Sequence, residues 1–554
     1  MRTLDWWVLC SSVVFIIVYG LWRSRDTKSV NQYLLAGKTM PWYAMALSIM
    51  ATQASAITFI STSGQAYVDG MRFVQFYFGL PLAMIIVSAT AVPLFHRANV
   101  YTAYEYLEQR FDAKTRALVS LIFLIQRGLA VGVALYAPAI VLTVILGWPD
   151  QWTTIIMGTI VVAYTTFGGI KAVTWTDFQQ MLVMFLGLFV SLGMAWRLLP
   201  ADVSLTDALH LAGAAGRLNA VVTSFDWNDR YNLWTGLIGG MFLALAYFGC
   251  DQSQVQRYLT GKSIAQSRLS LLFNAVAKIP MQFFILSIGA LVFVFYTFEK
   301  PPIVFHQVEM ANLARTGEYA GLSKRYDAAF ERRREAARRY LSSRNETSLA
   351  GYRGAQAEFE STRKAGIKLV EKTSGSSFND TNYIFLSFVL GYLPAGIVGL
   401  VLAAILAAAM STISAEINSL STVTVIDVYQ RHIHKDASDG HYLLVSRLAT
   451  VFWGAYAVVT AGYGRSLGSL IEAVNMLGSF FYGGLLGVFV LAFAAPRVGG
   501  TAAFMAVLVG EAVIFILHYT TGIAFLWYNV IGCVVVVCTG WLLSAAGIGR
   551  RVAA

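Results

Sequence analysis

"ALSIMATQASAITFISTSGQAY", residues 46–67, is an apolar stretch of membrane-spanning length with Ser, Thr and Gln side chains throughout its middle. A second stretch, "GLIGGMFLALAYFGCDQSQVQRYL" at residues 236–259, stays apolar until Gly249 and then turns polar at Asp251 and Gln252. Broken helices of this kind expose backbone carbonyl and amide groups that can replace the water around a solute or an ion. Two interrupted spans in the two halves of one chain are therefore the strongest indication of its fold and of its binding site.

Apolar residues dominate the rest of the chain. Of its 554 residues 57% are hydrophobic and 13% are charged, and the mean hydropathy is +0.60. A soluble domain carries about 25% charged residues. The apolar residues fall into repeated runs of about 20, the length that crosses a hydrocarbon core of ~30 Å. We expect an all-α polytopic membrane protein with about 13 transmembrane helices, because the alternating ~10-residue segments of a membrane β-barrel are not found.

The distribution of charge and cysteine excludes several other classes of protein. The net charge of +11 does not indicate a nucleic-acid partner, because the Lys and Arg residues lie in short loops where they set the orientation, here N-out and C-in. The four cysteines, Cys10, Cys250, Cys533 and Cys538, all lie in apolar runs and show no metal-ligand spacing. No spaced cluster of His, Cys or carboxylate side chains indicates an enzyme. We expect a multi-pass protein of the plasma (cell inner) membrane whose surroundings are lipid.

The spans divide the chain into four parts. We expect an anchor span and cytoplasmic loop over 1–41, a first repeat of five spans over 42–231, a second repeat of five over 232–494, and two C-terminal spans over 495–554. The first span has neither a positive n-region nor a small-residue cleavage site, so we interpret it as a retained anchor.

Residues 298–380 interrupt the regular succession of apolar spans. They contain 15 basic and 11 acidic residues, including the run "AAFERRREAARRYL", and predict a soluble helical insertion on the outer face. The simpler interpretation is a solvated helical hairpin with no part in transport, which would leave the chain without a protein partner. The alternative is that the insertion binds a partner or gates the transporter.

A third polar stretch, "AAAMSTISAEINSLST" at residues 407–422, ends a long apolar run. On a helix, Ser411 and Ala415 lie on one face with Ala408 one turn earlier, and Thr412 and Glu416 lie on the adjacent stripe. A hydroxyl in a span can bond to its own helix or allow close packing, so one hydroxyl alone indicates little. A Ser–Thr pair opposite a broken helix would supply the neutral oxygens that a hard monovalent cation needs.

Charged residues within membrane spans are energetically costly, so each one indicates a structural or functional role. A carboxylate at mid-depth costs ~2.5–3.5 kcal/mol, so Asp177 is expected to face a cavity, an ion or a partner, or to pair with Lys171 at the interface. Arg127 is expected to pair with a carboxylate, with a counter-ion or substrate-clamping role as the alternative. Asp251 and Glu416 are open to both a structural and a transport role.

The motifs "SIMATQASAITFIS", "YTAYEYLEQRF", "GGIKAVTWTDFQQ", "DQSQVQRYL" and "AAAMSTISAEINSLSTVTVIDVYQR" together resemble the sodium:solute symporter family. The resemblance extends from the first span to the last, apart from 298–380. "TAYEYLEQRF" and "YAPAIVL" are similar to the branch of iodide, monocarboxylate and multivitamin carriers rather than to the glucose carriers. The resemblance implies the leucine-transporter fold, in which two inverted five-helix repeats carry additional spans at each end.

The resemblance also implies where Na⁺ binds. The core sodium site would consist of the carbonyls of Ala51, Ala54 and Ala408 and the hydroxyls of Ser411 and Thr412. A second sodium would lie near Asp177, with hydroxyls that include those of Ser411 and Ser414. Ala415 lacks the hydroxyl that this second site would use, which weakens it. Glu416 departs from the small or apolar residue of the family and has no explanation from the resemblance.

The solute is less well defined. Sugar carriers of the family place polar residues at the positions of Ile57, Thr58 and Tyr77, and an Asn-like residue at Asp251, which argues against a hexose bound in the usual way. The expected cavity residues are Gln53, Ser55, Thr58, Gln75, Tyr77, Phe248, Asp251 and Gln252. We therefore expect a sodium-coupled symporter that imports a small polar or anionic organic solute by alternating access. The alternatives are uptake of a sugar, sugar acid or polyol, and a solute-sensing receptor or channel on the same fold.

Overall fold

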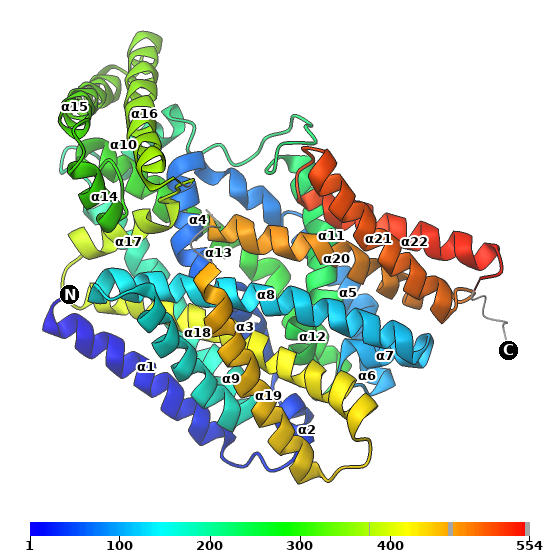
Figure 1. Cartoon of the computed structure of the whole chain (residues 1–554). Coiled ribbons are helices and arrows are strands. Elements are labelled where there is room, and N and C mark those ends of the chain that lie inside the picture. The colour runs from blue at the N-terminus through cyan, green and yellow to red at the C-terminus, as the bar shows by residue number, and fades with distance from the viewer. Residues whose placement is uncertain (376, 464–468, 549–554) are drawn as a thin grey trace.

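The computed structural model describes residues 1–375, 377–463 and 469–548 and is almost entirely α-helical in these ranges (Figure 1). Residue 376 of the expected insertion, residues 464–468 of the expected second repeat and residues 549–554 of the expected C-terminal part lie outside the described residues. In the described part, ten helical segments are long and apolar enough to cross a membrane. The expected all-α membrane architecture is confirmed.

Both expected breaks are present. The first separates α3 (Trp42–Gln53) from α4 (Ala56–Asp69) at Ala54 and Ser55. The second separates α11 (Gly240–Gly249) from α12 (Gln252–Leu259) at Cys250 and Asp251. Each break comes where the apolar run gives way to polar side chains. The second break lies within a residue or two of the position that the sequence indicated, and the first lies within the predicted stretch 46–67.

The number of helices differs from the expected number of spans because some helices are joined. Helix α9 (Asp150–Arg197) has 48 residues, and a helix of that length measures about 70 Å, more than twice a bilayer core. Gly169 within it has φ 56° and ψ −159°, a conformation that glycine adopts readily, so the helix kinks there. The kink divides α9 into the two spans that the sequence predicts over 152–169 and 174–198.

The remaining helices surround these elements, and several short ones connect them. The long helices are α1 (Thr3–Ser24), α8 (Ala113–Leu146), α13 (Ile264–Phe298), α18 (Ile397–Val423), α19 (Asp439–Ala461), α20 (Leu470–Ala494), α21 (Gly500–Thr520) and α22 (Leu526–Ala545). The connecting elements include α2 (Val30–Leu35), η2 (Gly70–Tyr77), α5 (Leu80–Ala89), α6 (Ala91–Ala98), α7 (Ala103–Arg110), α10 (Leu205–Ala214), η3 (Thr235–Gly239), α17 (Thr381–Tyr392) and η4 (Thr424–Ile433).

Helix α18 is the centre of the bundle. Every residue from Val401 to Val423 is buried, and the helix packs against α1, α3, α8 and α9. A helix that is apolar and buried on all sides belongs in the core of a bundle rather than at the lipid surface. This position brings the Thr412 hydroxyl into contact with the first broken helix, where it donates to Thr52 O.

The insertion forms three helices, α14 (Gln307–Ala314), α15 (Tyr319–Ser343) and α16 (Glu346–Ser374). The last two form a hairpin beside α10, at the upper left of Figure 1. The helices enclose a small core of their own that includes Tyr326, Phe330 and Phe359. The hairpin is also docked on the membrane helices, since Arg333 donates to the Tyr296 carbonyl and Arg353 Nε donates to Ala214 O at 3.0 Å.

We expect the transporter core to fold without this hairpin. The chain enters and leaves the insertion at adjacent points, because Phe305 N donates to Asp380 Oδ2 at 2.8 Å. A variant with residues 307–378 replaced by a short Gly-Ser linker should therefore purify as a folded protein. We also expect Na⁺ to raise the melting temperature of this variant as much as that of the full chain. A folded deletion variant that no longer responds to Na⁺ would instead give the hairpin a part in ion binding or gating.

Candidate solute and ion site

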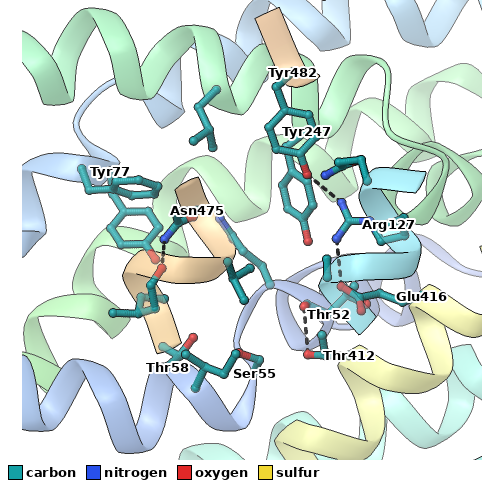
Figure 2. A pocket seen from close by; sticks show the side chains of 18 residues that line it. Thr52, Ser55, Thr58, Tyr77, Arg127, Tyr247, Thr412, Glu416, Asn475 and Tyr482 are labelled. Carbon is teal, nitrogen blue, oxygen red and sulfur yellow. Dashed lines mark hydrogen bonds and ion pairs between the residues drawn. The ribbon is translucent and has the colours of Figure 1, made fainter. Parts of the chain in front are cut away.

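A cavity of ≈ 100 Å³ lies where the first broken helix meets η2, α8, α11, α18 and α20. Polar and aromatic side chains make up much of its wall. Figure 2 shows Tyr77 and Asn475 on one side of it, and Tyr247, Tyr482, Arg127 and Glu416 on the other. The wall consists of Thr52, Gln53, Ser55, Ile57, Thr58, Phe76, Tyr77, Gln126, Arg127, Ala130, Leu243, Tyr247, Thr412, Glu416, Ile471, Val474, Asn475 and Tyr482.

The first break leaves backbone groups open toward α18. A helix ends with four carbonyls that have no partner within the helix. Of those of α3, the Thr52 carbonyl accepts from Thr412 Oγ1 at 3.1 Å, and no backbone N–H of the described chain is seen bonded to Ala51 O or Ala54 O. Ser55, at the start of α4, gives no side-chain cap to that helix. Thr412 Oγ1 also lies 3.2 Å from Ala408 O.

The Asp177 carboxylate contacts Ser48 of α3, ahead of this break in the chain, and is fully buried. Its Oδ2 atom accepts from Ser48 Oγ at 2.6 Å and lies 3.0 Å from Arg257 Nη1, which in turn donates to Ser48 Oγ at 2.8 Å. Asp177 therefore pairs with Arg257 on α12 and not with Lys171, which was the alternative expected from the sequence. Ser414 Oγ, the other side chain expected near Asp177, donates to Ser411 O of its own helix at 3.0 Å.

The second break is capped by its own side chain. Asp251 is the N-cap of α12, and its Oδ1 atom accepts from Ser253 N at 2.9 Å and from Ser253 Oγ at 2.7 Å. Its Oδ2 atom accepts from Tyr482 OH at 3.0 Å and from Arg127 Nη2. Capping with a carboxylate thus buries a negative charge at the break, and Arg127 neutralises it.

Arg127 also binds Glu416. Its Nη1 atom donates to Glu416 Oε1 at 2.8 Å, and its Nη2 atom donates to Tyr482 OH at 2.6 Å (Figure 2). The exposed fractions of Arg127 and Glu416 are 3% and 4%. The expected pairing of Arg127 with a carboxylate is confirmed, with two partners instead of one. Glu416, which the sequence left unexplained, lies on the cavity wall one turn after Thr412.

The structure brings four of the eight expected solute residues to the cavity: Gln53, Ser55, Thr58 and Tyr77. Of the other four, Phe248, Asp251 and Gln252 lie behind the wall. Asp251 caps α12, Phe248 is fully buried, and Gln252 accepts from Ala103 N at 3.0 Å and donates to Tyr101 O at 2.9 Å. The sequence did not assign Tyr247, Asn475 and Tyr482 to the site. The apolar spans in which they lie gave no signal that distinguishes a side chain facing the cavity from one packed in the core.

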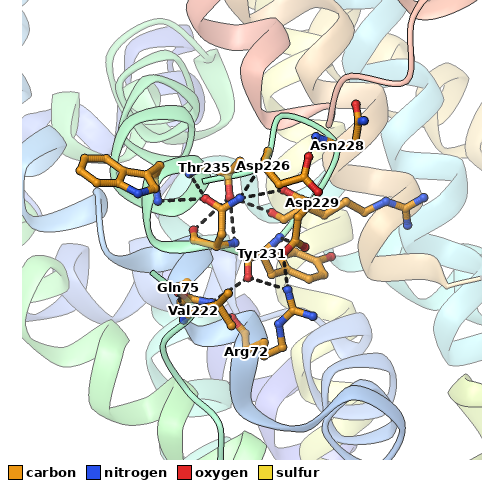
Figure 3. Close-up of polar contacts among 11 residues, drawn as sticks. Arg72, Gln75, Val222, Asp226, Asn228, Asp229, Tyr231 and Thr235 are labelled. Atoms are coloured by element: carbon orange, nitrogen blue, oxygen red, sulfur yellow. Dashed lines mark hydrogen bonds and ion pairs between the residues drawn. The ribbon is translucent and has the colours of Figure 1, made fainter. Parts of the chain in front are cut away.

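Gln75 instead holds a loop of residues 219–234, which we call the outer loop. Its Nε2 atom donates to Tyr231 O at 2.8 Å, and its Oε1 atom accepts from Val222 N at 2.8 Å (Figure 3). Arg72 binds the loop as well, through the Asp229 carboxylate and the Tyr231 carbonyl. Gln75 is therefore part of the structure above the cavity rather than of its wall.

The outer loop is also tied to α20, which supplies part of the wall. Glu472 accepts from Tyr231 OH at 3.1 Å and from Arg230 Nη1 at 2.6 Å. Burial, together with the neighbouring Glu472 carboxylate, raises the pKa of Tyr231 well above its ordinary value, so its hydroxyl remains a donor. Because Ile471, Val474 and Asn475 of the same helix line the cavity, movement of the loop is mechanically linked to the cavity wall.

Comparison with known proteins identifies relatives along nearly the whole chain. The sequence profile of the Sodium:solute symporter family matches residues 33–316 and 362–510, leaving out most of the insertion. The chain is similar to the sodium/sialic acid symporter NanT of Aliivibrio fischeri, with 25% identity over 98% of this chain and 93% of the relative. It is also similar to sodium-coupled monocarboxylate transporter 1 of Xenopus laevis, with 27% identity over 91% and 69% of the two chains.

Two further matches refine this comparison. The human sodium/iodide cotransporter is 32% identical over 50% of this chain and 43% of its own length. Among solved structures, a substrate-bound, outward-open Na⁺-coupled sialic acid symporter superposes with a TM-score of 0.78 and 23% identity, over 99% of both chains. This match establishes the fold as that of the leucine transporter, with its five-plus-five inverted repeat.

The pairing of Asp177 with Arg257 yields a testable expectation. Replacing Asp177 with Asn leaves a buried guanidinium without its counter-charge, which costs about 3–5 kcal/mol, so the variant should melt well below the wild type. Adding Arg257→Gln should recover much of that loss, because no buried charge then remains unpaired. Melting of the purified single and double variants measures this. Equal melting temperatures of the single and the double variant would mean that the unpaired Arg257 guanidinium costs no stability.

Proposed function

Because this chain belongs to the sodium:solute symporter family and Na⁺ is its coupling ion, we propose that it imports a small polar organic solute by alternating access across the plasma membrane. It is a multi-pass transporter and not an enzyme. Its proposed partners are the ion, the solute and the surrounding lipid, and the insertion is proposed to work without a protein partner.

The open end of α3 carries this proposal. Na⁺ would be bound by the carbonyls of Ala51, Ala54 and Ala408 and by the hydroxyls of Ser411 and Thr412. Support comes from the carbonyls of Ala51 and Ala54, to which no backbone N–H of the described chain is bonded, and from the Ser411 hydroxyl, which is fully buried close to the Asp177 carboxylate. Thr412 already spans the two helices through its contacts with Thr52 O and Ala408 O. These are all neutral oxygens, the ligand type that Na⁺ prefers.

A second sodium between Asp177 and Ser414 has weaker support. Asp177 Oδ1 has no hydrogen-bond partner, but Arg257 already neutralises the carboxylate. Ser414 donates to its own helix, and the neighbouring Ala415 has no hydroxyl. We therefore propose one sodium ion per cycle as the coupling ion, bound at the core site.

The ion would couple to the solute through the first broken helix. Na⁺ between α3 and α18 would hold the two helices together and fix Gln53, Ser55 and Thr58 in the cavity wall. Opening toward the cytoplasm, where Na⁺ is scarce, would release the ion and free the wall to let the solute leave. One charge that moves through 100 mV supplies about 2.3 kcal/mol, enough for accumulation of several tens-fold before the sodium gradient is counted.

The cavity supports a small solute with several hydrogen-bonding groups. Gln53, Ser55, Thr58 and Asn475 provide amide and hydroxyl groups, and the aromatic residues provide apolar faces. This favours the polar alternative over the anionic one, because the one arginine on the wall is already paired with two carboxylates. A receptor or channel on the same fold would bind the solute, or pass Na⁺, without coupled uptake.

Removing the Thr412 hydroxyl tests the ion site. Thr412→Ala should raise the Na⁺ concentration for half-maximal thermal stabilisation by about tenfold, the equivalent of one ligand worth about 1–2 kcal/mol. Ser419→Ala is the matched control on the same buried helix, since the Ser419 hydroxyl bonds only to Glu416 O of its own helix, at 2.8 Å. An unchanged sodium dependence in Thr412→Ala would place the ion elsewhere.

A further inference from the structure

The charged groups around the cavity do not balance on the side formed by α8, α12 and α18. One guanidinium, that of Arg127, lies between two carboxylates, those of Asp251 and Glu416. All three side chains are buried, with exposed fractions of 3%, 0% and 4%. This cluster therefore carries one negative charge more than it neutralises, within the membrane-spanning part of the protein.

The surplus charge belongs to Glu416 rather than to Asp251. Asp251 accepts hydrogen bonds from Ser253, Tyr482 and Arg127, so both of its oxygens are occupied. Glu416 accepts one bond, from Arg127 to Oε1, and its Oε2 atom is buried without a hydrogen-bond partner. Of the two carboxylates, only Glu416 borders the cavity.

A lone carboxylate oxygen at this depth requires a cation. An ionised group left unpaired in an apolar interior costs several kcal/mol, and protein structures rarely keep one without a partner. Arg257 is already paired with Asp177, and Lys278, a further buried cation in this region, does not serve this role. Its Nζ lies 5.2 Å from the centre of the Tyr77 ring, and Tyr77 and Glu416 stand on opposite sides of the cavity in Figure 2. The compensating positive charge is then either a proton on Glu416 itself or a cation that enters the cavity.

The aromatic wall indicates which cation this is. Phe76 and Tyr482 line the same cavity as Glu416, as do Tyr77 and Tyr247, whose rings already face Lys278 and Arg127. Aromatic faces attract organic cations, by about 0.5–2 kcal/mol each where water is excluded. A carboxylate with aromatic rings around it suits an ammonium group on a carbon skeleton, whereas a bare sodium ion needs converging oxygens, which the open end of α3 provides.

We propose that the transported solute carries an ammonium group, and that Glu416 Oε2 binds this group in the cavity. The inference rests on the proposed transport function and specifies its substrate class: an amine-bearing zwitterion or cation. The ammonium ion would complete the charge balance of the Arg127–Asp251–Glu416 cluster. Since Glu416 lies one turn after Thr412, the bound amine would lie beside the proposed sodium site without sharing its ligands.

Matched pairs of small molecules test the proposal on the full-length protein. L-Alanine and L-lactate share one skeleton and differ only in an ammonium or a hydroxyl group, and so do L-serine and glycerate. Ethanolamine and ethylene glycol form a third pair, which separates a cationic solute from a zwitterionic one. The measurements are thermal stabilisation in the presence of Na⁺ and uptake into proteoliposomes under a sodium gradient. We expect the amine of at least one pair to bind and to be taken up in clear preference to its hydroxyl partner.

Variants at position 416 identify the group that binds the amine. Glu416→Gln should raise the concentration of the amine for half-maximal uptake by about thirtyfold or more, the loss expected for one partner of a buried charged pair. Glu416→Asp keeps the charge and should retain part of the affinity. Neither variant should shift the half-saturating Na⁺ concentration as Thr412→Ala does. Glu511→Gln on α21 is the matched control, because that carboxylate also lacks hydrogen-bond partners but lies outside the cavity wall.

The outcomes separate this inference from the transport function on which it rests. Sodium-dependent uptake of hydroxyl or anionic probes that equals or exceeds uptake of the amines would overturn the ammonium proposal and leave the symporter intact. Amine uptake that Glu416→Gln does not alter would overturn the role of Glu416. Absence of stabilisation by every amine probe would also overturn the proposal. The transport function itself fails if Na⁺ neither stabilises the protein nor drives uptake of any probe.

Discussion

The two helix breaks impose the constraint on which the rest of the structure depends. A bilayer offers no water to exposed carbonyl and amide groups, so each break must be satisfied from within the protein. The backbone groups of the two breaks are treated differently. At the second break Asp251 caps the new helix with its own carboxylate. At the first break Ser55 provides no such cap, and the carbonyls of Ala51 and Ala54 accept from no backbone N–H of the described residues. The open break is the one suited to an ion.

The capped break accounts for the buried charges. A carboxylate that caps a helix within the membrane brings a negative charge with it, and Arg127 compensates that charge. Arg127 in turn reaches Glu416 on the neighbouring helix, so three helices are joined by one guanidinium. Asp177 and Arg257 repeat the arrangement between α9 and α12, close to the first break. Both arginine-centred clusters therefore lie beside a helix break.

The elements outside the membrane have a different role. The outer loop is bound to η2 through Arg72 and Gln75 and to α20 through Glu472, above a cavity that both elements line. The insertion has its own core and docks on α10 and α13 by polar contacts and by apolar side chains, among them Ala337 and Tyr352, that join the main core. The loop is consequently placed to follow movements of the cavity wall, whereas the insertion is attached to the side of the bundle.

The sequence by itself determined the membrane class, the two breaks, the insertion and the presence of buried charges, because each depends on hydropathy and residue type within a short window. It also showed that Arg127 requires a carboxylate, since an unpaired charge is costly in lipid. Only the tertiary structure decided which groups meet. The partners of Arg127 lie 124 and 289 residues away, and Asp177 pairs with Arg257 rather than with nearby Lys171. Gln75 and Gln252 are as polar as Gln53, yet only Gln53 reaches the cavity. A local pattern shows that a buried polar group needs a partner. The packing of helices that are distant in the sequence determines which residue that partner is.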